Sequence, residues 1–253
     1  MRVGIVCEGP TDFWAISSFV GESLKARGVS AIFVDLQPTI DASSASSGGG
    51  WTNAFAWLEN NPRAYRRIQY LDGGLFGNGL SGKACDCLLV QIDSDVLDGD
   101  DFANYIRRHY GIDINVAVYP SDRFDEVQKA LAVAAGYQTI ADAILDQHVI
   151  APAVENTDAW CVAARDPTVI DVESRRKNAV LIELERCFAE FEDGAPPAGG
   201  LKNEMRRKLY CAYHKENYRD VENLCALYAK TVTMLSTVLP PPQPAGATHN
   251  PGA

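Results

Sequence analysis

The first half of the chain alternates short apolar runs with segments of helical character. Residues 2–7, 31–36 and 87–92 are apolar runs of strand length. The last of them is apolar at nearly every position, as in a central strand that is buried on both faces. Shorter runs at residues 115–119 and 148–154 predict two further strands.

Predicted helices separate these strands. The first begins at Thr11 or Asp12, either of which can cap a helix, and ends near Arg27, where Gly28 stops it. Residues 52–68, 100–110 and 123–146 are predicted to form three more helices. Strands that alternate with helices in this way predict an α/β fold with a mostly parallel, doubly wound sheet.

After residue 155 the pattern is helical, with predicted helices at residues 157–164, 176–192, 202–214 and 218–238. We interpret residues 1–165 as an α/β core and residues 166–239 as a helical C-terminal extension packed on it. Two stretches offer no core-forming residues. The Ser/Ala/Gly-rich residues 43–50 predict a mobile loop, and the Pro/Gly/Ala-rich residues 240–253 predict a disordered tail.

Composition narrows the class of protein. The chain has 253 residues, of which 47% are hydrophobic and 22% charged, as in an ordinary globular protein. It has no apolar run of the ~20 residues that a membrane helix needs, and its start does not resemble a signal peptide. Seven scattered cysteines favour a reduced, cytoplasmic interior over a disulfide framework.

The net charge of −10 argues against a surface that binds nucleic acid by charge alone. It does not exclude a nuclease, because a bound metal ion supplies its own positive charge. Side chains that can hold a metal ion are therefore the candidate functional residues.

Acidic residues follow two of the predicted strands. Glu8 comes directly after the first strand, and Asp93 and Asp95 come directly after the central one. In open parallel sheets, ligands bind beyond the carboxyl ends of the strands. Either motif alone is more often a helix cap or an ordinary loop. Because the two motifs occur together at strand ends, we predict that the three carboxylates hold Mg²⁺ or Mn²⁺, which prefer oxygen ligands.

These motifs resemble a known family. Val6-Cys7-Glu8-Gly9 and Ile92-Asp93-Ser94-Asp95 resemble the two signatures of the TOPRIM fold, which primases, type IA and type II topoisomerases and OLD-family nucleases share. The run Cys7-Glu8-Gly9-Pro10-Thr11-Asp12 is especially similar to small stand-alone TOPRIM-like proteins, which are often linked to mobile elements or defence. The resemblance covers about residues 2–165. It implies Glu8 as a general acid/base, Asp93 and Asp95 as metal ligands, and residues 40–82 as an insertion.

A second acidic segment lies at residues 155–160. The same family tends to carry a Glu-x-x-Glu-Ala-Trp-like segment, which Glu155-Asn156-Thr157-Asp158-Ala159-Trp160 resembles, with Asp158 in place of the second Glu. Glu155 and Asp158 follow the predicted strand at residues 148–154, so they are candidate metal ligands at the same site. The alternative is that Asn156 or Thr157 caps a helix whose N-terminus the two acids stabilise. We expect Trp160 to be a core residue.

Basic residues supply candidates for substrate binding. Residues 77–83 have the spacing of a P-loop. However, Ala84 replaces the magnesium-binding Ser or Thr, and a strand follows where a P-loop is followed by a helix. Lys83 is therefore a candidate phosphate contact within an ordinary loop. Other basic residues gather at 175–177 and 202–215. In helical register Arg206, Arg207 and His214 share a face with Tyr210 and Tyr213, as suits a nucleic-acid strand. More often such a run is an ordinary solvated helix face.

Together these features predict a divalent-metal-dependent phosphodiester hydrolase, a TOPRIM-like nuclease acting on nucleic acid in a defence or mobile-element system, with a partner such as an ATPase. The rival interpretation is a non-catalytic module that binds a nucleotide or a partner protein. A phosphatase or phosphotransferase is a third interpretation, for which we identify no nucleophile. The sequence leaves open whether the substrate is DNA, RNA or a small nucleotide, and whether the chain forms a homo-oligomer.

Overall fold

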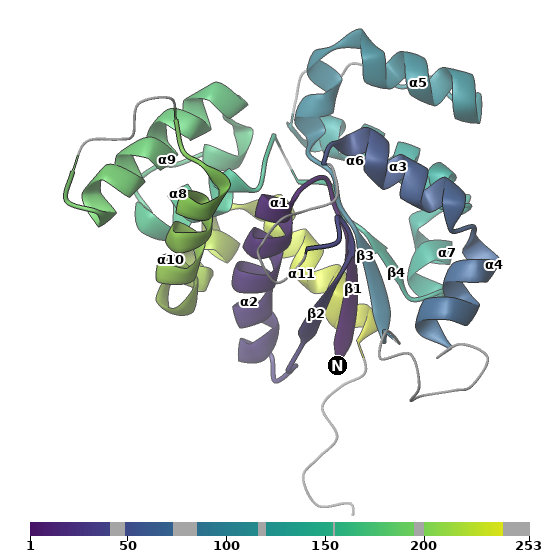
Figure 1. Cartoon of the computed structure of the whole chain (residues 1–253), viewed down its shortest axis with the longest axis horizontal. Helices are drawn as coiled ribbons and strands as arrows, with labels where there is room; N and C mark the ends of the chain where they lie inside the picture. The colour runs from purple at the N-terminus through teal and green to yellow at the C-terminus, as the bar shows by residue number, and fades with distance from the viewer. Residues whose placement is uncertain (41–48, 73–84, 116–119, 154, 195–199, 240–253) are drawn as a thin grey trace, which may run out of the picture.

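The computed structural model describes residues 1–40, 49–72, 85–115, 120–153, 155–194 and 200–239. The described strands form one parallel sheet in the order β2-β1-β3-β4 (Figure 1). Their bounds are β1 Arg2–Val6, β2 Ile32–Gln37, β3 Cys87–Val90 and β4 His148–Ile150. Four of the five predicted strands are thereby confirmed. Most of the fifth, at residues 115–119, lies outside the described residues.

Helices cover both faces of the sheet, because alternate residues of each strand point to opposite sides. On one face, Val3, Ile5 and Leu89 pack in a core with helices α1, α2, α8, α10 and α11. On the other face, Leu88 and Val90 pack in a second core with α3, α5, α6 and α7 (Figure 1). The structure is therefore an α/β fold with an all-parallel sheet between two helical layers, as predicted.

The helices have the following bounds. On the first face they are α1 Pro10–Ala15, α2 Gly21–Ala26, α8 Asp158–Arg165, α9 Lys177–Phe191, α10 Asn203–Leu224 and α11 Ala226–Val238. On the second they are α3 Trp51–Asn60, α4 Arg63–Arg66, α5 Asp100–Tyr110, α6 Pro120–Ala134 and α7 Ile140–Leu145. Two π-helical turns, η1 Ile16–Val20 and η2 Arg67–Leu71, and two 3₁₀ turns, η3 Ser94–Asp98 and η4 Val172–Ser174, complete the described elements.

Three helix boundaries differ from the prediction. The expected helix at 123–146 is two helices, because Gly136 adopts φ +80° and the Thr139 side chain accepts the Asp142 N–H to start a new helix. The expected helix at 52–68 is broken before α4, where Pro62 is extended. The expected break at residues 215–217 is absent, and the chain instead turns at Cys225 between α10 and α11.

The C-terminal helices belong to the same core as the sheet. Tyr210 of α10 and Tyr228 of α11 are buried in one cluster with Val3 and Ile5 of β1. The Tyr228 hydroxyl also lies 2.8 Å from the Ser23 hydroxyl of α2. Residues 166–239 are thus joined to the α/β core by buried apolar contacts.

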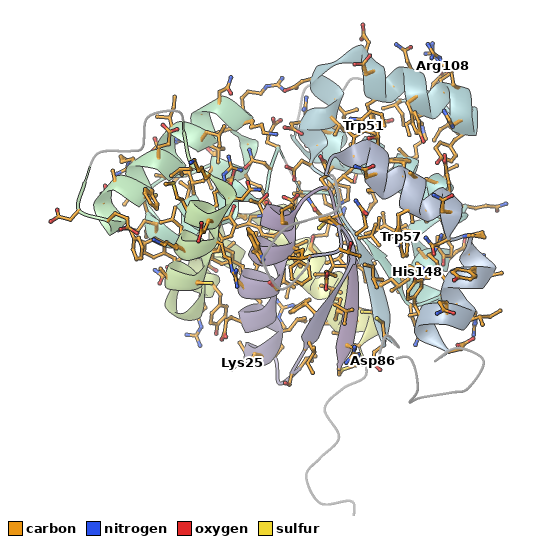
Figure 2. All side chains as sticks on the ribbon, viewed as in Figure 1. Lys25, Trp51, Trp57, Asp86, Arg108 and His148 are labelled. Carbon is orange, nitrogen blue, oxygen red and sulfur yellow. The ribbon has the colours of Figure 1, made fainter. Side chains whose placement is uncertain are left out.

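The segment interpreted as an insertion also contributes to the core. Phe55 and Leu58 of α3 are buried in the second core. The ring centre of Trp51, labelled in Figure 2, lies 5.3 Å from that of Phe102 and 5.1 Å from that of Tyr105, both in α5. Most of the predicted mobile loop, the glycine-rich residues 73–82 and the predicted disordered tail lie outside the described residues. In the part of the chain that the structure describes, no helix has the length and apolar character needed to cross a membrane.

Candidate metal centre

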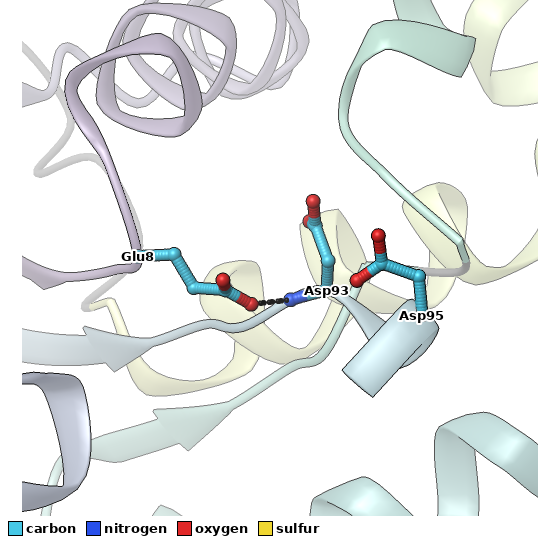
Figure 3. Close-up of side chains that lie close together, drawn as sticks. All are labelled: Glu8, Asp93 and Asp95. Atoms are coloured by element: carbon cyan, nitrogen blue, oxygen red, sulfur yellow. Dashed lines mark hydrogen bonds between the residues drawn. The ribbon is translucent and has the colours of Figure 1, made fainter. Parts of the chain in front are cut away.

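The sheet brings the two acidic motifs to one edge. Strands β1 and β3 are neighbours, with Val6 paired to Val90, so residues just beyond them emerge side by side. Glu8 and Asp93 follow these strands, and Asp95 lies in the 3₁₀ turn η3. Carboxylate oxygens of the three residues lie within 4.8 Å of one another (Figure 3). The predicted convergence of these side chains is what the structure shows.

Hydrogen bonds hold each carboxylate in place. The backbone N–H of Asp93 donates to Glu8 Oε1 at 2.7 Å (Figure 3). Gln91 Nε2 donates to Asp93 Oδ1 at 3.0 Å. Lys177 Nζ, from the first turn of α9, donates to Asp95 Oδ2 at 2.6 Å. The cluster is therefore preorganised by the backbone and by neighbouring side chains.

Glycine residues allow a loop to approach Glu8 closely. Gly50 N–H donates to the Glu8 carbonyl at 2.8 Å, and Gly50 adopts φ +103°, which favours glycine. A Cβ on Gly49 would lie 2.9 Å from the same carbonyl oxygen, so a larger residue does not fit there. The end of the Ser/Ala/Gly-rich stretch thus packs against the backbone of the cluster.

The cluster is electrostatically unfavourable without a metal ion, even with Lys177 beside Asp95. Burial raises the pKa of Glu8 to about 8, and the nearby Asp12 and Asp95 carboxylates add to the increase. Burial, then repulsion by Asp12, Glu8 and Asp95, raises the pKa of Asp93 well above its usual value. Burial also raises the pKa of Asp12 to about 6. A divalent cation would offset this repulsion.

The donor set fits a hard divalent cation. Within the described residues, this is the one group of three acidic, His or Cys side chains whose ligand atoms lie so close together. All three ligands are carboxylates, which suit Mg²⁺ or Mn²⁺ better than softer metals that prefer Cys or His. Glu8, Asp93 and Asp95 are therefore the residues that would hold the ion.

A cleft of about 250 Å³ opens beside the cluster. Its lining includes residues from the ends of β1 and β3 and from the starts of several helices: Glu8, Gly9, Pro10, Thr11, Asp12, Gly49, Gly50, Asp93, Asn156, Thr157, Asp158, Lys177, Asn203 and Arg206. The cleft lies at the carboxyl edge of the sheet, where parallel sheets bind their ligands.

Glu155 and Asp158 have other partners and are not part of the three-carboxylate cluster. Glu155 is 2% exposed, and its Oε1 lies 3.1 Å from Arg123 Nε. Asp158 lines the cleft, but Arg206 Nη1 lies 3.1 Å from its Oδ2 and the Tyr210 hydroxyl donates to its Oδ1. Both acids are therefore buried and paired with an arginine.

The predicted cap of the following helix is not formed either. Thr157 occupies the cap position of α8, but its hydroxyl donates to Asp12 Oδ1 at 2.8 Å and caps nothing. This bond links α8 to the Glu8 motif. Trp160 is 2% exposed and packs in the first core, as expected.

The predicted basic face of α10 is only partly correct. Arg206 lines the cleft, whereas the Arg207 guanidinium lies 5.2 Å from the centre of the Trp14 ring. Tyr210 is fully buried, so it belongs neither to a surface for a nucleic-acid strand nor to a solvated helix face. Lys83 and the side chain of His214 lie outside the described residues.

Sequence reasoning assigned no role in the site to Asp12, Asn156, Lys177 or Asn203, all of which line the cleft. Lys177 belongs to the basic run at residues 175–177, and Asp12 ends the Glu8 motif, so both carried a signal. Asn156 and Asn203 carried none beyond a tendency to start helices.

No protein-family model matches the chain, and neither a curated protein nor a solved structure matches it. The interpretation of function therefore depends on the motifs and on the geometry of the site.

Proposed function

We propose that this protein is a TOPRIM-like, divalent-metal-dependent phosphodiester hydrolase that acts on nucleic acid. The observation that carries the proposal is the convergence of the Glu8, Asp93 and Asp95 carboxylates within 4.8 Å at the carboxyl edge of a parallel sheet. The adjoining cleft contains two cationic side chains, Lys177 and Arg206, that complement a phosphate. A role in defence or in a mobile element, with an ATPase as partner, is proposed from the family resemblance alone.

Each residue of the cluster has a part in this chemistry. Bound Mg²⁺ or Mn²⁺ would polarise the phosphate and make water a stronger nucleophile. Asp93 and Asp95 would hold the ion, while Lys177 orients Asp95 and places positive charge beside the phosphate. The family resemblance implies that Glu8 exchanges the proton, and the bond from Asp93 N–H to Glu8 Oε1 at 2.7 Å holds its carboxyl group beside the ion's ligands.

The test is a nuclease assay with a matched variant. The purified chain with Mg²⁺ or Mn²⁺ should cleave single- or double-stranded DNA or RNA, and Glu8→Gln should lower the rate by about 10²–10⁴-fold because Gln cannot exchange a proton. Glu22→Gln, the same change on α2 away from the cleft, serves as the control and should keep full activity.

Two results decide against the proposal. Cleavage that survives Glu8→Gln, Asp93→Asn and Asp95→Asn places the chemistry elsewhere. Metal binding at this cluster without cleavage of any tested substrate, alone or with an ATPase partner, favours the non-catalytic binding module instead.

A further inference from the structure

Several helices begin at the cleft beside the carboxylate cluster. Cleft-lining residues lie at the N-terminal ends of α3, α8, α9 and α10, represented by Gly50, Asp158, Lys177 and Asn203. The structure records no side-chain cap at any of these four ends within the described residues. The first N–H groups of a helix have no partner inside the helix, and its dipole makes this end positive. Converging helix N-termini therefore favour an anion in the cleft.

A buried amide gives a second, independent sign of a ligand. Asn156 lines the cleft and is 2% exposed, yet neither atom of its amide group has a hydrogen-bond partner among the described residues. Buried polar side chains are nearly always partnered, so such an amide calls for an explanation. A ligand in the cleft would supply both the acceptor and the donor that it lacks.

The charges of the cleft specify which anion fits. Glu8, Asp12, Asp93 and Asp158 are four carboxylates among the lining residues, against the two cations Lys177 and Arg206. Once these carboxyl groups are ionised, they would repel a lone anion. An anion that enters with a divalent cation is different, because the cation complements the carboxylates and the anion complements Lys177 and Arg206. Phosphate with bound Mg²⁺ or Mn²⁺ has this chemistry.

The size of the cleft limits what can carry that phosphate. At about 250 Å³ it is smaller than the sites that hold drug-sized ligands, which span about 300–1,000 Å³. Buried Asn156 and Asp158 form part of its wall. A cleft of this size has room for a phosphate group and the sugar that carries it.

We infer that the cleft binds a terminal phosphate monoester, carried by a strand end or by a free nucleotide. The N–H groups of the first residues of α8, α9 and α10, which are Asp158, Lys177 and Asn203, would hold this phosphate together with the Asn156 amide and the Lys177 and Arg206 cations. The inference rests on the proposed function, because it assumes that the bond to be cleaved lies at the neighbouring carboxylates. An enzyme with this site would act on the ends of strands or on small nucleotides.

Binding of inorganic phosphate in the presence of Mg²⁺ tests the site without any catalysis. Thermal unfolding of the full chain should show stabilisation by millimolar phosphate. Asn156→Leu should weaken this binding by about tenfold or more, because a hydrogen bond to a charged group is lost. The same variant should unfold at the wild-type temperature or above it, because the amide that it removes is unpartnered. A purely structural Asn156 would not separate binding from stability in this way.

Lys177→Gln provides a second variant, because its side chain is 47% exposed and its removal is tolerable for folding. It should also weaken phosphate binding. Asn104→Leu, on the exposed face of α5, is the matched control and should leave binding unchanged. The inference is overturned when wild-type protein shows no response to phosphate with Mg²⁺, or when Asn156→Leu and Lys177→Gln both bind phosphate as tightly as wild type.

Strand ends and free nucleotides are distinguished with the Glu8→Gln protein. Linear strands with a terminal phosphate should bind more tightly than hydroxyl-ended or circular strands, and competition by mononucleotides at similar concentration would identify the free nucleotide as the ligand. Equal binding of circular strands would overturn the inference. Phosphate binding without any nuclease activity refutes the proposed function and leaves this site standing, whereas nuclease activity without phosphate binding refutes this site alone.

Discussion

Replacing Glu8 by Gln should stabilise the metal-free protein, although Glu8 is proposed to be essential for activity. The pKa of Glu8 is raised from 4.5 to about 8 by burial and by the repulsion of Asp12 and Asp95. A carboxyl group with a higher pKa in the folded protein than in the unfolded chain binds more protons when folded. Stability is therefore undiminished below about pH 4.5 and falls as the pH rises towards about 8.

The pKa shift sets the size of the effect. At pH 7 the unfolded chain has lost this proton while the folded protein still holds it, which costs on the order of 3 kcal/mol. Gln can still accept the hydrogen bond that Asp93 N–H donates to Glu8, and it carries no charge. Asp12 and Asp93 share in the titration, so part of the gain is lost. We expect Glu8→Gln to raise the free energy of unfolding by about 1–3 kcal/mol at pH 7.

Urea unfolding in the presence of a chelator, at about pH 5, 7 and 8.5, measures this gain. The difference between Glu8→Gln and wild type should be small at the lowest pH and largest at the highest. Glu22→Gln should show no such trend. The reasoning would be refuted by a difference that does not grow with pH, or by a Glu8→Gln protein that is less stable than wild type at high pH. Either result would mean that burial and repulsion do not make ionised Glu8 destabilising.

Two further predictions concern the metal and the far end of the sheet. Mg²⁺ or Mn²⁺ should raise the melting temperature of wild type and not of Asp93→Asn/Asp95→Asn, because the ion binds only the folded cluster; an unchanged response in the double variant counts against this site. His148, labelled in Figure 2, accepts a hydrogen bond from Arg66 at 3.1 Å, and burial lowers its pKa from 6.5 to about 4. Stability linked to His148 should therefore be lost as the pH falls from about 6.5 to about 4, by up to about 3 kcal/mol, and an NMR titration of its ring near pH 6.5 would contradict this.

The sheet could be predicted from sequence because each strand is a short apolar run that is visible in its own residues. Residues 87–92 are apolar at nearly every position, and the structure places β3 between β1 and β4, where both faces of the strand are buried. The acids of the cluster were predictable for the same reason. Glu8 and Asp93 come directly after their strands, and parallel strands end at one edge.

The rest of the site depends on contacts between distant parts of the chain. Asn156, Lys177 and Asn203 begin three different helices, and only the packing of those helices brings them to one cleft. Glu155 was a candidate metal ligand because the sequence does not reveal that Arg123 of α6 lies 3.1 Å away. No periodicity within either segment indicates such a pairing.

Helical register left a similar ambiguity in α10. Tyr210 lies four positions after Arg206, so both were placed on one face expected to contact a strand. The same spacing serves an inward face, and in the structure the Tyr210 hydroxyl donates to buried Asp158 while Arg206 pairs with the same carboxylate. The periodicity of the sequence correctly placed Arg206 and Tyr210 on one face of α10. Only the packing of α10 against α8 determines that this face points inward.

The acidity of the cleft makes the order of binding part of the proposed mechanism. Once its carboxyl groups are ionised, the cleft has four carboxylates against two cationic side chains, and a divalent cation would balance this charge and let a phosphate bind. In the proposed mechanism the metal would then be required for the substrate to bind as well as for the chemistry. Because the coupling between two ligands is reciprocal, phosphate must strengthen metal binding by the same factor by which metal strengthens phosphate binding. A chain with a net charge of −10 would in this way select an anionic substrate through the ion that we propose it holds and through the helix N-termini around it.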